Sequence, residues 1–296
     1  LTDKIVDQNP SLVGFSCYMW NIEGFLDIAK KLKVRLPDTR VLLGGPEIST
    51  EYVQQSNFDN YAVDYCISGE GELTFLELLQ YLGHEKPSLT DIAGLSHRSK
   101  RSLPFIVNSK RTPFKSLAEI PSPFLEGVVD EEVLARPGIE ANIETQRGCN
   151  LRCSYCIYHK DMDRVTYSEV ERVINEVRFV IDRGVKKVRF VDANFTSKKI
   201  HAKSVMKSLI REKFETQLFF ELIPGFIDEE LANLFGQFRK MHSANQITIG
   251  VGVQSINRAT LKRMRRPIRK EKFEKTFQLL QKNDIYTKID LIIGLP

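Results

Sequence analysis

Three cysteines in one short segment are the residues whose types and spacing most directly indicate chemistry. The segment reads CNLRCSYC, which gives Cys149, Cys153 and Cys156 the spacing C-x3-C-x2-C. Three thiolates on a short loop can ligate three irons of a [4Fe–4S] cluster and leave the fourth iron open. A small molecule with an amine and a carboxylate can chelate the open iron, and an electron from the cluster can then cleave it. The spacing therefore indicates a reaction site.

Zinc is the alternative reading of the same segment. His159 follows Cys156 as C-x2-H, and three cysteines with one histidine form a common tetrahedral zinc site. Here all four ligands would come from one contiguous loop, which is an awkward geometry for a closed tetrahedron. A zinc-stapled binding protein without catalysis remains open at this point, and iron with labile sulfide, or zinc without it, would separate the two.

The two other cysteines, Cys17 and Cys66, stand alone in apolar, strand-like runs, where a free cysteine packs as a small hydrophobe. Basic and acidic residues number 43 and 38 and are dispersed, so the net charge of +5 does not by itself indicate nucleic acid. The densest basic run, residues 262–272, is interpreted as a solvated helix face. Neither a membrane-spanning run nor a signal peptide is evident, so we expect a cytoplasmic protein without a membrane or nucleic-acid partner.

Two series of β/α units must position these side chains. In the first series we expect strands over residues 12–18, 40–43 and 61–67, and helices over residues 23–35 and 72–81. Glycine-containing turns follow the second and third of these strands. Because ligands of open α/β sheets bind at the carboxyl ends of the strands, both turns are candidate binding segments.

The second series predicts a β/α barrel or a doubly wound sheet. Its expected strands lie near residues 139–145, 187–191, 218–223, 246–253 and 287–293, and its expected helices cover residues 167–183, 198–213, 228–240 and 270–283. The cysteine segment follows the first strand, and Gly148 allows a tight turn there.

Prolines and weak periodicity mark a connector between the two series. We therefore divide the chain into a first domain over residues 1–86, a connector over 87–138 with a small hairpin at 104–107 and 110–114, and a second domain over 139–296. The chain begins with Leu1 and ends on a strand. We expect a piece of a longer protein, which lacks the first strand of the first domain and everything after the fifth barrel strand.

The run RGCNLRCSYC, with Tyr155 before its last cysteine, resembles the signature of the radical S-adenosylmethionine (SAM) superfamily. The runs VRFVD, ELIP and GVGVQS resemble the family's later strands, in the right order. The resemblance implies a [4Fe–4S] cluster and SAM held in a partial (β/α) barrel. By position it assigns SAM contacts to Tyr155, Asp192, Glu221, Gln254 and Ser255.

The first domain resembles the Rossmann-like cobalamin-binding domain that precedes the barrel in the cobalamin-dependent subgroup. The matching residues are Ser16, Gly44, Gly45, Pro46, Glu47, Ser68, Gly69, Glu70, Gly71 and Glu72. Small residues there would let backbone amides approach the corrin ring. The sequence lacks the Asp-x-His-x-x-Gly run that supplies a lower histidine ligand. Cobalamin is thus expected without a protein histidine; the alternative is a domain that serves only as scaffold.

These resemblances imply an α/β enzyme that methylates an unactivated carbon or phosphorus centre. A radical cyclase or ring-modifying enzyme is the alternative within the class. The expected partners are a small-molecule substrate, which the sequence does not identify, and an electron donor such as flavodoxin or ferredoxin. We assign no catalytic residue from the sequence.

Overall fold

The structure is a computed structural model that describes residues 1–296 except 57–61, 99–102, 159–163, 213, 243–246 and 267. The chain forms two compact units, Leu1–Pro113 and Phe114–Pro296, and each is described by itself. No helix in the described residues is both long and apolar enough to cross a lipid bilayer.

The first unit is built on a five-stranded sheet in the order β1-β2-β3-β4-β5. The strands are β1 (Leu12–Ser16), β2 (Arg40–Gly44), β3 (Tyr65–Ile67), β4 (Leu95–His97) and β5 (Ile106–Val107). The first three run parallel, whereas β4 and β5 are antiparallel additions. The helices are α1 (Thr2–Val6), α2 (Ile22–Arg35), α3 (Thr50–Gln55) and α4 (Glu72–His84).

Both faces of strand β2 are covered, which explains its continuous apolar sequence. Val41 and Leu43 belong to one buried cluster together with Leu32 of α2. Leu42, which points to the other face, belongs to a second cluster with Leu78 of α4. The carboxyl ends of β1, β2 and β3 therefore lie at one edge of a sheet sandwiched between helices.

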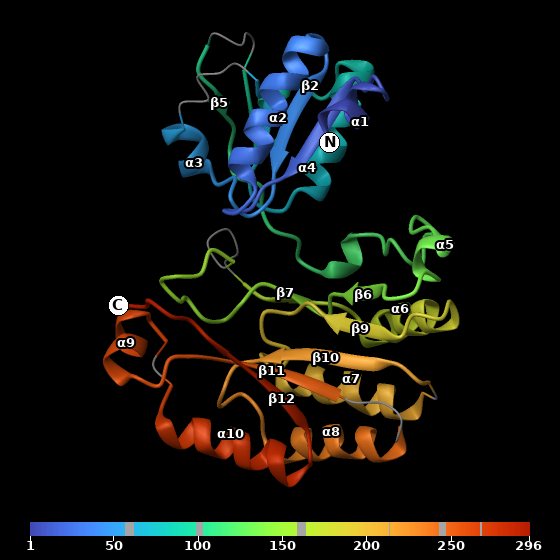
Figure 1. Cartoon of the computed structure of the whole chain (residues 1–296), viewed down its shortest axis with the longest axis vertical. Helices are drawn as coiled ribbons and strands as arrows, with labels where there is room; N and C mark the ends of the chain where they lie inside the picture. Colours follow the sequence, from blue (N-terminus) through green and yellow to red (C-terminus); the bar gives the residue numbers. More distant parts are fainter. Residues whose placement is uncertain (57–61, 99–102, 159–163, 213, 243–246, 267) are drawn as a thin grey trace. The chain divides into compact units, whose positions relative to one another are not determined.

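The second unit contains a five-stranded parallel sheet in the order β12-β11-β10-β9-β6. Its strands are β6 (Glu140–Ile143), β9 (Lys187–Phe190), β10 (Gln217–Leu222), β11 (Ile247–Gln254) and β12 (Tyr286–Leu291). Its helices are α5 (Glu131–Leu134), α6 (Val170–Asp182), α7 (Lys199–Arg211), α8 (Glu229–Met241), α9 (Arg258–Arg263) and α10 (Lys270–Lys282). Figure 1 shows α7, α8 and α10 side by side along this sheet.

Alternating side chains give this sheet two different faces. One face is apolar and packs on the helices; Phe190 of β9 and Phe220 of β10 stack there with ring centroids 4.4 Å apart. The intervening residues form the opposite face, which we call the inner face. In register across the strands it carries Asn142, Arg189, Phe219, Glu221, Gly250 and Lys288. The expected order of an N-terminal Rossmann-like unit followed by a partial β/α barrel is confirmed.

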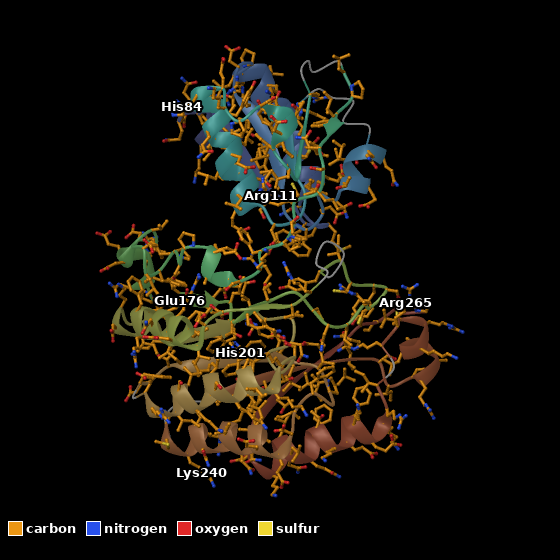
Figure 2. The ribbon with its side chains drawn as sticks, turned by 180° about the vertical axis from the view of Figure 1, so that it is seen from behind. His84, Arg111, Glu176, His201, Lys240 and Arg265 are labelled. Atoms are coloured by element: carbon orange, nitrogen blue, oxygen red, sulfur yellow. The ribbon has the colours of Figure 1, made fainter. Side chains whose placement is uncertain are left out.

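The connector expected over residues 87–138 is divided between the two units. Strands β4 and β5 extend the first sheet, and β5 pairs with β4 instead of forming a hairpin with residues 110–114. Further along, Phe124 and Leu134 join the core of the second unit. Arg172 of α6 pairs with Glu176, which is labelled in Figure 2, and donates hydrogen bonds to the carbonyls of Leu117 and Ile120. Strands of two and three residues are too short to show a periodic signal, so the sequence reads as a connector.

Candidate functional site

The cysteine segment lies in the loop that follows the first strand of the second unit's sheet. After β6 the chain forms β7 (Gln146–Arg147), which pairs with β8 (Thr166–Tyr167). Gly148 then has a φ of +98°, and a Cβ there would lie 2.5 Å from the carbonyl oxygen of Arg164. Only glycine fits this conformation and this contact. The tight turn expected at Gly148 is therefore present.

All three thiols lie on the loop that follows this turn. Cys153 is 4% exposed, while Cys149 and Cys156 are half-buried. The Cys156 amide donates to the Cys153 carbonyl at 3.1 Å, and the Leu151 amide donates to Sγ of Cys149 at 3.4 Å. Burial raises the pKa of the Cys149 thiol, so a thiolate at this position needs a nearby positive charge.

This donor set fits a cluster of irons. In the described residues, no three side chains of histidine, cysteine, aspartate or glutamate converge as ligands of a single metal ion. Three thiolates on one loop match the ligand set that holds three irons of a [4Fe–4S] cluster. His159, the fourth ligand of the zinc alternative, lies outside the described residues. The three cysteines therefore remain predicted cluster ligands.

The segment after α9 packs directly on the cysteine loop. The Ser154 amide donates to the carbonyl of Met264 at 3.0 Å. The Arg266 guanidinium donates through Nη1 to Sγ of Cys153 at 3.4 Å and through Nη2 to the carbonyl of Gly252 on β11 at 2.6 Å. Sequence reasoning assigned this basic run to a solvated helix face. That interpretation is wrong for Arg266, which is 4% exposed, although Arg265 beside it is exposed (Figure 2).

Asp192 is buried and binds the backbone just before the cysteine loop. Its carboxylate is 1% exposed and accepts hydrogen bonds from the Thr145 amide at 2.8 Å, the Thr145 hydroxyl at 2.6 Å and the Gln146 amide at 2.9 Å. Burial raises the pKa of Asp192 to about 7, although these hydrogen bonds act in the opposite direction. This position favours a function in holding the strand that leads to the cysteines over the predicted contact with SAM.

Glu221 lies on the inner face and is available to a ligand. Its side chain is 33% exposed, with Oε1 4.0 Å from Nη1 of Arg189 on the next strand. Burial and the nearby Asp290 raise the pKa of the Glu221 carboxyl. A Cβ on Gly250 would lie 2.7 Å from Cδ of Glu221, so this glycine leaves the space that the carboxylate occupies.

The other predicted SAM contacts lie near the carboxyl end of β11 or on the cysteine loop. Gln254 ends β11 with a φ of +64°, and the Ser255 hydroxyl accepts a hydrogen bond from the Asn257 amide at 3.2 Å. Gly252 makes room for the Gln254 side chain, since a Cβ there would lie 2.8 Å from its Nε2. Burial raises the pKa of Tyr155 to about 12, and Cys153 beside it contributes to that shift.

Sequence reasoning found Glu221 but missed other charged residues of the inner face. Arg189 pairs with Glu140 of β6 and covers the ring of Phe219 at 4.0 Å from the centroid. Lys288 and Asp290 face the same side from β12 and lie 3.4 Å apart. The sequence pattern that could have identified them is the alternation of charged with apolar residues along VRF and KID. Such alternation indicates a sheet face that is not packed on helices.

In the first unit, the predicted turns follow adjacent parallel strands. Gly45 has a φ of +97°, and a Cβ there would lie 2.7 Å from both the amide nitrogen and the carbonyl oxygen of Cys17. The loop after β1 is thus held against the loop after β2, with the Glu47 amide donating to the Cys17 carbonyl at 3.1 Å. Cys17 and Cys66 are both fully buried, as expected for packing residues.

The second turn contains an unpartnered polar group. The Ser68 hydroxyl is buried at the end of β3 and has no hydrogen-bond partner among the described residues. A buried hydroxyl without a partner costs free energy, and a bound ligand would supply the partner. Six of the remaining predicted cobalamin residues lie on the same strand ends and turns, namely Ser16, Gly44, Pro46, Gly69, Glu70 and Gly71. The last, Glu72, is the first residue of α4. The site residues of this unit stay predictions.

An exposed aromatic pair follows strand β1 and was not predicted. The rings of Tyr18 and Trp20 stack with centroids 4.7 Å apart, and Trp20 is 76% exposed. Met19 between them is equally open, at 78%. The available signal was the chain's only tryptophan in a loop at a strand end. Exposed apolar groups of this kind mark binding surfaces.

Two family profiles match the chain. The radical SAM superfamily profile matches residues 143–296, and the B12 binding domain profile matches residues 1–79. Together they include the cysteine loop, the residues named above on the inner face of the second unit except Asn142, and both turns of the first unit.

Curated relatives share this arrangement along nearly the whole chain. It is 28% identical to the cobalamin-dependent radical SAM methyltransferase TokK of Streptomyces tokunonensis, covering 100% of this chain and 44% of that protein. It is 27% identical to 2-(S-pantetheinyl)-carbapenam-3-carboxylate methyltransferase of Streptantibioticus cattleyicolor, covering 97% of this chain and 43% of that protein. The chain thus spans less than half the length of these relatives.

Solved structures show the same fold. TsrM from Kitasatospora setae, a radical SAM methyltransferase solved with cobalamin and a [4Fe–4S] cluster, superimposes with a TM-score of 0.73 at 18% identity, covering 100% of this chain and 59% of that one. The cobalamin-dependent SAM radical enzyme OxsB, with aqua-cobalamin bound, superimposes with a TM-score of 0.77 at 19% identity, covering 98% and 42%.

Proposed function

Because this chain belongs to the radical SAM superfamily and carries a B12 binding domain, we propose that it is a cobalamin-dependent methyltransferase that works by radical chemistry. The observation that carries the proposal is the three-thiol loop, which leaves the sheet through the Gly148 turn and is attached by Arg266 to the carboxyl end of β11. Catalysis in β/α barrels takes place at the carboxyl ends of the strands.

Cys149, Cys153 and Cys156 would hold a [4Fe–4S] cluster through three of its irons. Bound there, the cluster would supply one electron that cleaves SAM to methionine and a 5′-deoxyadenosyl radical, and cobalamin would supply the methyl group. The loop itself contributes geometry. Asp192 fixes the strand end before it, and the Met264 carbonyl fixes Ser154 within it.

The inner face offers charges for the methionyl part of SAM, which carries an amine and a carboxylate. Glu221, half-exposed, is suited to accept from the amine, while Lys288 of β12 is suited to the carboxylate. Arg189 places a positive charge 4.0 Å from the Glu221 carboxylate. Opposite charges on β10 and β12, which flank β11 in the sheet, give such a ligand one preferred orientation.

The first unit fits cobalamin in three ways. Ser68 presents a buried hydroxyl without a partner in the described residues, the turn at Gly45 brings two backbone loops together, and Trp20 with Met19 offers an exposed apolar surface. A flat macrocycle buries apolar area on such a surface and receives hydrogen bonds at its polar tail. Methyl transfer is favoured over cyclisation because the curated relatives named above are methyltransferases.

An electron donor of the flavodoxin or ferredoxin class would reduce the cluster, and the acceptor of the methyl group would be a small molecule. The proposal is tested by anaerobic reconstitution of the protein with iron and sulfide, followed by hydroxocobalamin, SAM labelled on its methyl group and dithionite as the reductant of both the cobalamin and the cluster. We expect label on cobalamin and, with an acceptor present, label on the acceptor together with 5′-deoxyadenosine. Label on the acceptor and 5′-deoxyadenosine that are equally abundant when cobalamin is left out would make the first unit a scaffold and would overturn methyl transfer through cobalamin.

A further inference from the structure

Arg266 is a buried cation beside the cysteine loop, and the fold alone leaves the function of this residue unexplained. It is 4% exposed, its Nη1 lies 3.4 Å from Sγ of Cys153, and its Nη2 donates to the Gly252 carbonyl at 2.6 Å. The Nε hydrogen is buried without a partner among the described residues. Within those residues, the guanidinium is thus surrounded by a thiol and a carbonyl, and no carboxylate pairs with it.

The surrounding backbone is built to hold this side chain. Arg265 has a φ of +53°, an uncommon conformation for a residue with a side chain, and it directs the next residue back toward the sheet. The Arg266 amide closes the turn by donating to the Leu261 carbonyl at 2.8 Å. On the sheet, a Cβ at Gly252 would lie 3.3 Å from Nη2, so a glycine at this position leaves room for the guanidinium.

A buried charge without a counter-charge is unfavourable, so its presence requires an anion nearby. Three thiolates around a [4Fe–4S]²⁺ core carry a net charge of −1, and one-electron reduction makes it −2. A cation that donates to one of the ligand sulfurs stabilises the more negative state more strongly. Hydrogen bonds to cluster sulfurs and local charge are the means by which a protein adjusts the potential of such a cluster.

We propose that Arg266 is a positioning residue that raises the reduction potential of the cluster by donating to the Cys153 sulfur from the turn after α9. The inference rests on the proposed cluster at the three cysteines. The redox step is the transfer of one electron from a reduced flavodoxin or ferredoxin to the oxidised core, with no bond made or broken in the protein. Arg266 makes this uptake easier and leaves the ligand set unchanged.

The test is a redox titration of the reconstituted protein with dithionite and mediators, in which the reduced cluster is followed by its EPR signal. At the midpoint potential of the wild-type cluster, we expect Arg266→Gln to lower the ratio of reduced to oxidised cluster by about tenfold, with iron and sulfide content unchanged. Arg266→Lys retains the charge without the planar fork, so the ratio falls less.

Arg263→Gln is the matched control, since it removes the same charge from an exposed position three residues away and should leave the ratio unchanged. An Arg266→Gln variant with full iron content and the wild-type midpoint potential would overturn the proposal. Loss of iron from that variant would also overturn it, because Arg266 would then only support the loop. Should the glutamine variant not fold, a fully loaded Arg266→Lys with an unchanged midpoint would also overturn it. Absence of iron and sulfide from the wild type would instead refute the proposed function.

Discussion

Gly250 and Glu221 face each other in register on β11 and β10, and a Cβ on Gly250 would lie 2.7 Å from Cδ of the glutamate. The carboxylate occupies the space that any other residue at position 250 would fill. The position of the predicted SAM contact therefore depends on a glycine in the neighbouring strand.

Gly250→Ala is expected to displace the Glu221 carboxylate and weaken SAM binding by about tenfold to a hundredfold, the range for one hydrogen bond to a charged group. Equilibrium dialysis with the reconstituted protein measures the affinity. Gly14→Ala is a matched control on a strand, since its Cβ would meet only Leu42 Cδ2 at 3.9 Å. Equal affinities for SAM in the wild type, Gly250→Ala and Gly14→Ala would exclude Glu221 from the SAM site.

Replacement of Cys149, Cys153 or Cys156 by alanine is expected to abolish the brown colour, the iron and the sulfide of the reconstituted protein. Each thiol would hold a different iron, so the loss of one leaves the cube incompletely ligated. Metal and sulfide analysis gives the result directly. Alanine at Cys17 or Cys66 should keep the full iron content; zinc bound without sulfide would contradict the cluster.

Gly45→Ala is expected to weaken cobalamin binding strongly, because the new Cβ meets the Cys17 backbone and because a φ of +97° is strained for alanine by about 1–2 kcal/mol. Gly83→Ala in α4 is the control, since a Cβ there meets nothing within 4 Å and the position is not a predicted cobalamin residue. Absorbance of bound hydroxocobalamin after gel filtration measures both. If Gly45→Ala binds as the wild type does, the turn lies outside the cobalamin site.

Ser68→Ala is expected to act in opposite directions on stability and on binding. Without ligand, removal of a buried hydroxyl that has no partner in the described residues should leave the melting temperature unchanged or higher. Cobalamin affinity should fall, because the ligand loses its partner. A lower melting temperature of the cobalamin-free variant would show that Ser68 is a structural residue.

The pKa of Asp192, raised to about 7 by burial from an ordinary value of 3.8, predicts a pH dependence of stability. The folded chain then binds this proton more tightly than the unfolded chain. Stability should therefore fall as the pH rises from about 4 to about 7, by at most about 1.4 kcal/mol per pH unit. Melting temperatures of the cofactor-free wild type and of Asp192→Asn, measured across this pH range, isolate the effect. The same change of melting temperature with pH in both proteins would contradict it.

The sequence alone determined the features that depend on short stretches of chain. The three cysteines lie within eight residues, so their spacing identified the ligand loop without any knowledge of distant contacts. Apolar periodicity likewise located β9, β10, β11 and the long helices close to their observed bounds. A strand or helix that buries one face needs apolar residues at a regular spacing, and that spacing is visible in the sequence. The turn at Gly148 followed from the same local logic.

The tertiary structure decided everything that rests on contacts between distant segments. Asp192 and Glu221 have the same kind of side chain at strand ends, yet one is buried beneath the cysteine loop and the other lies half-exposed on the inner face. Arg266 lies 113 residues from Cys153 in the chain and in a basic run that resembles a solvated surface. Its burial against the thiol depends on the turn after α9 and on a missing Cβ in β11, and these meet only when the sheet is assembled.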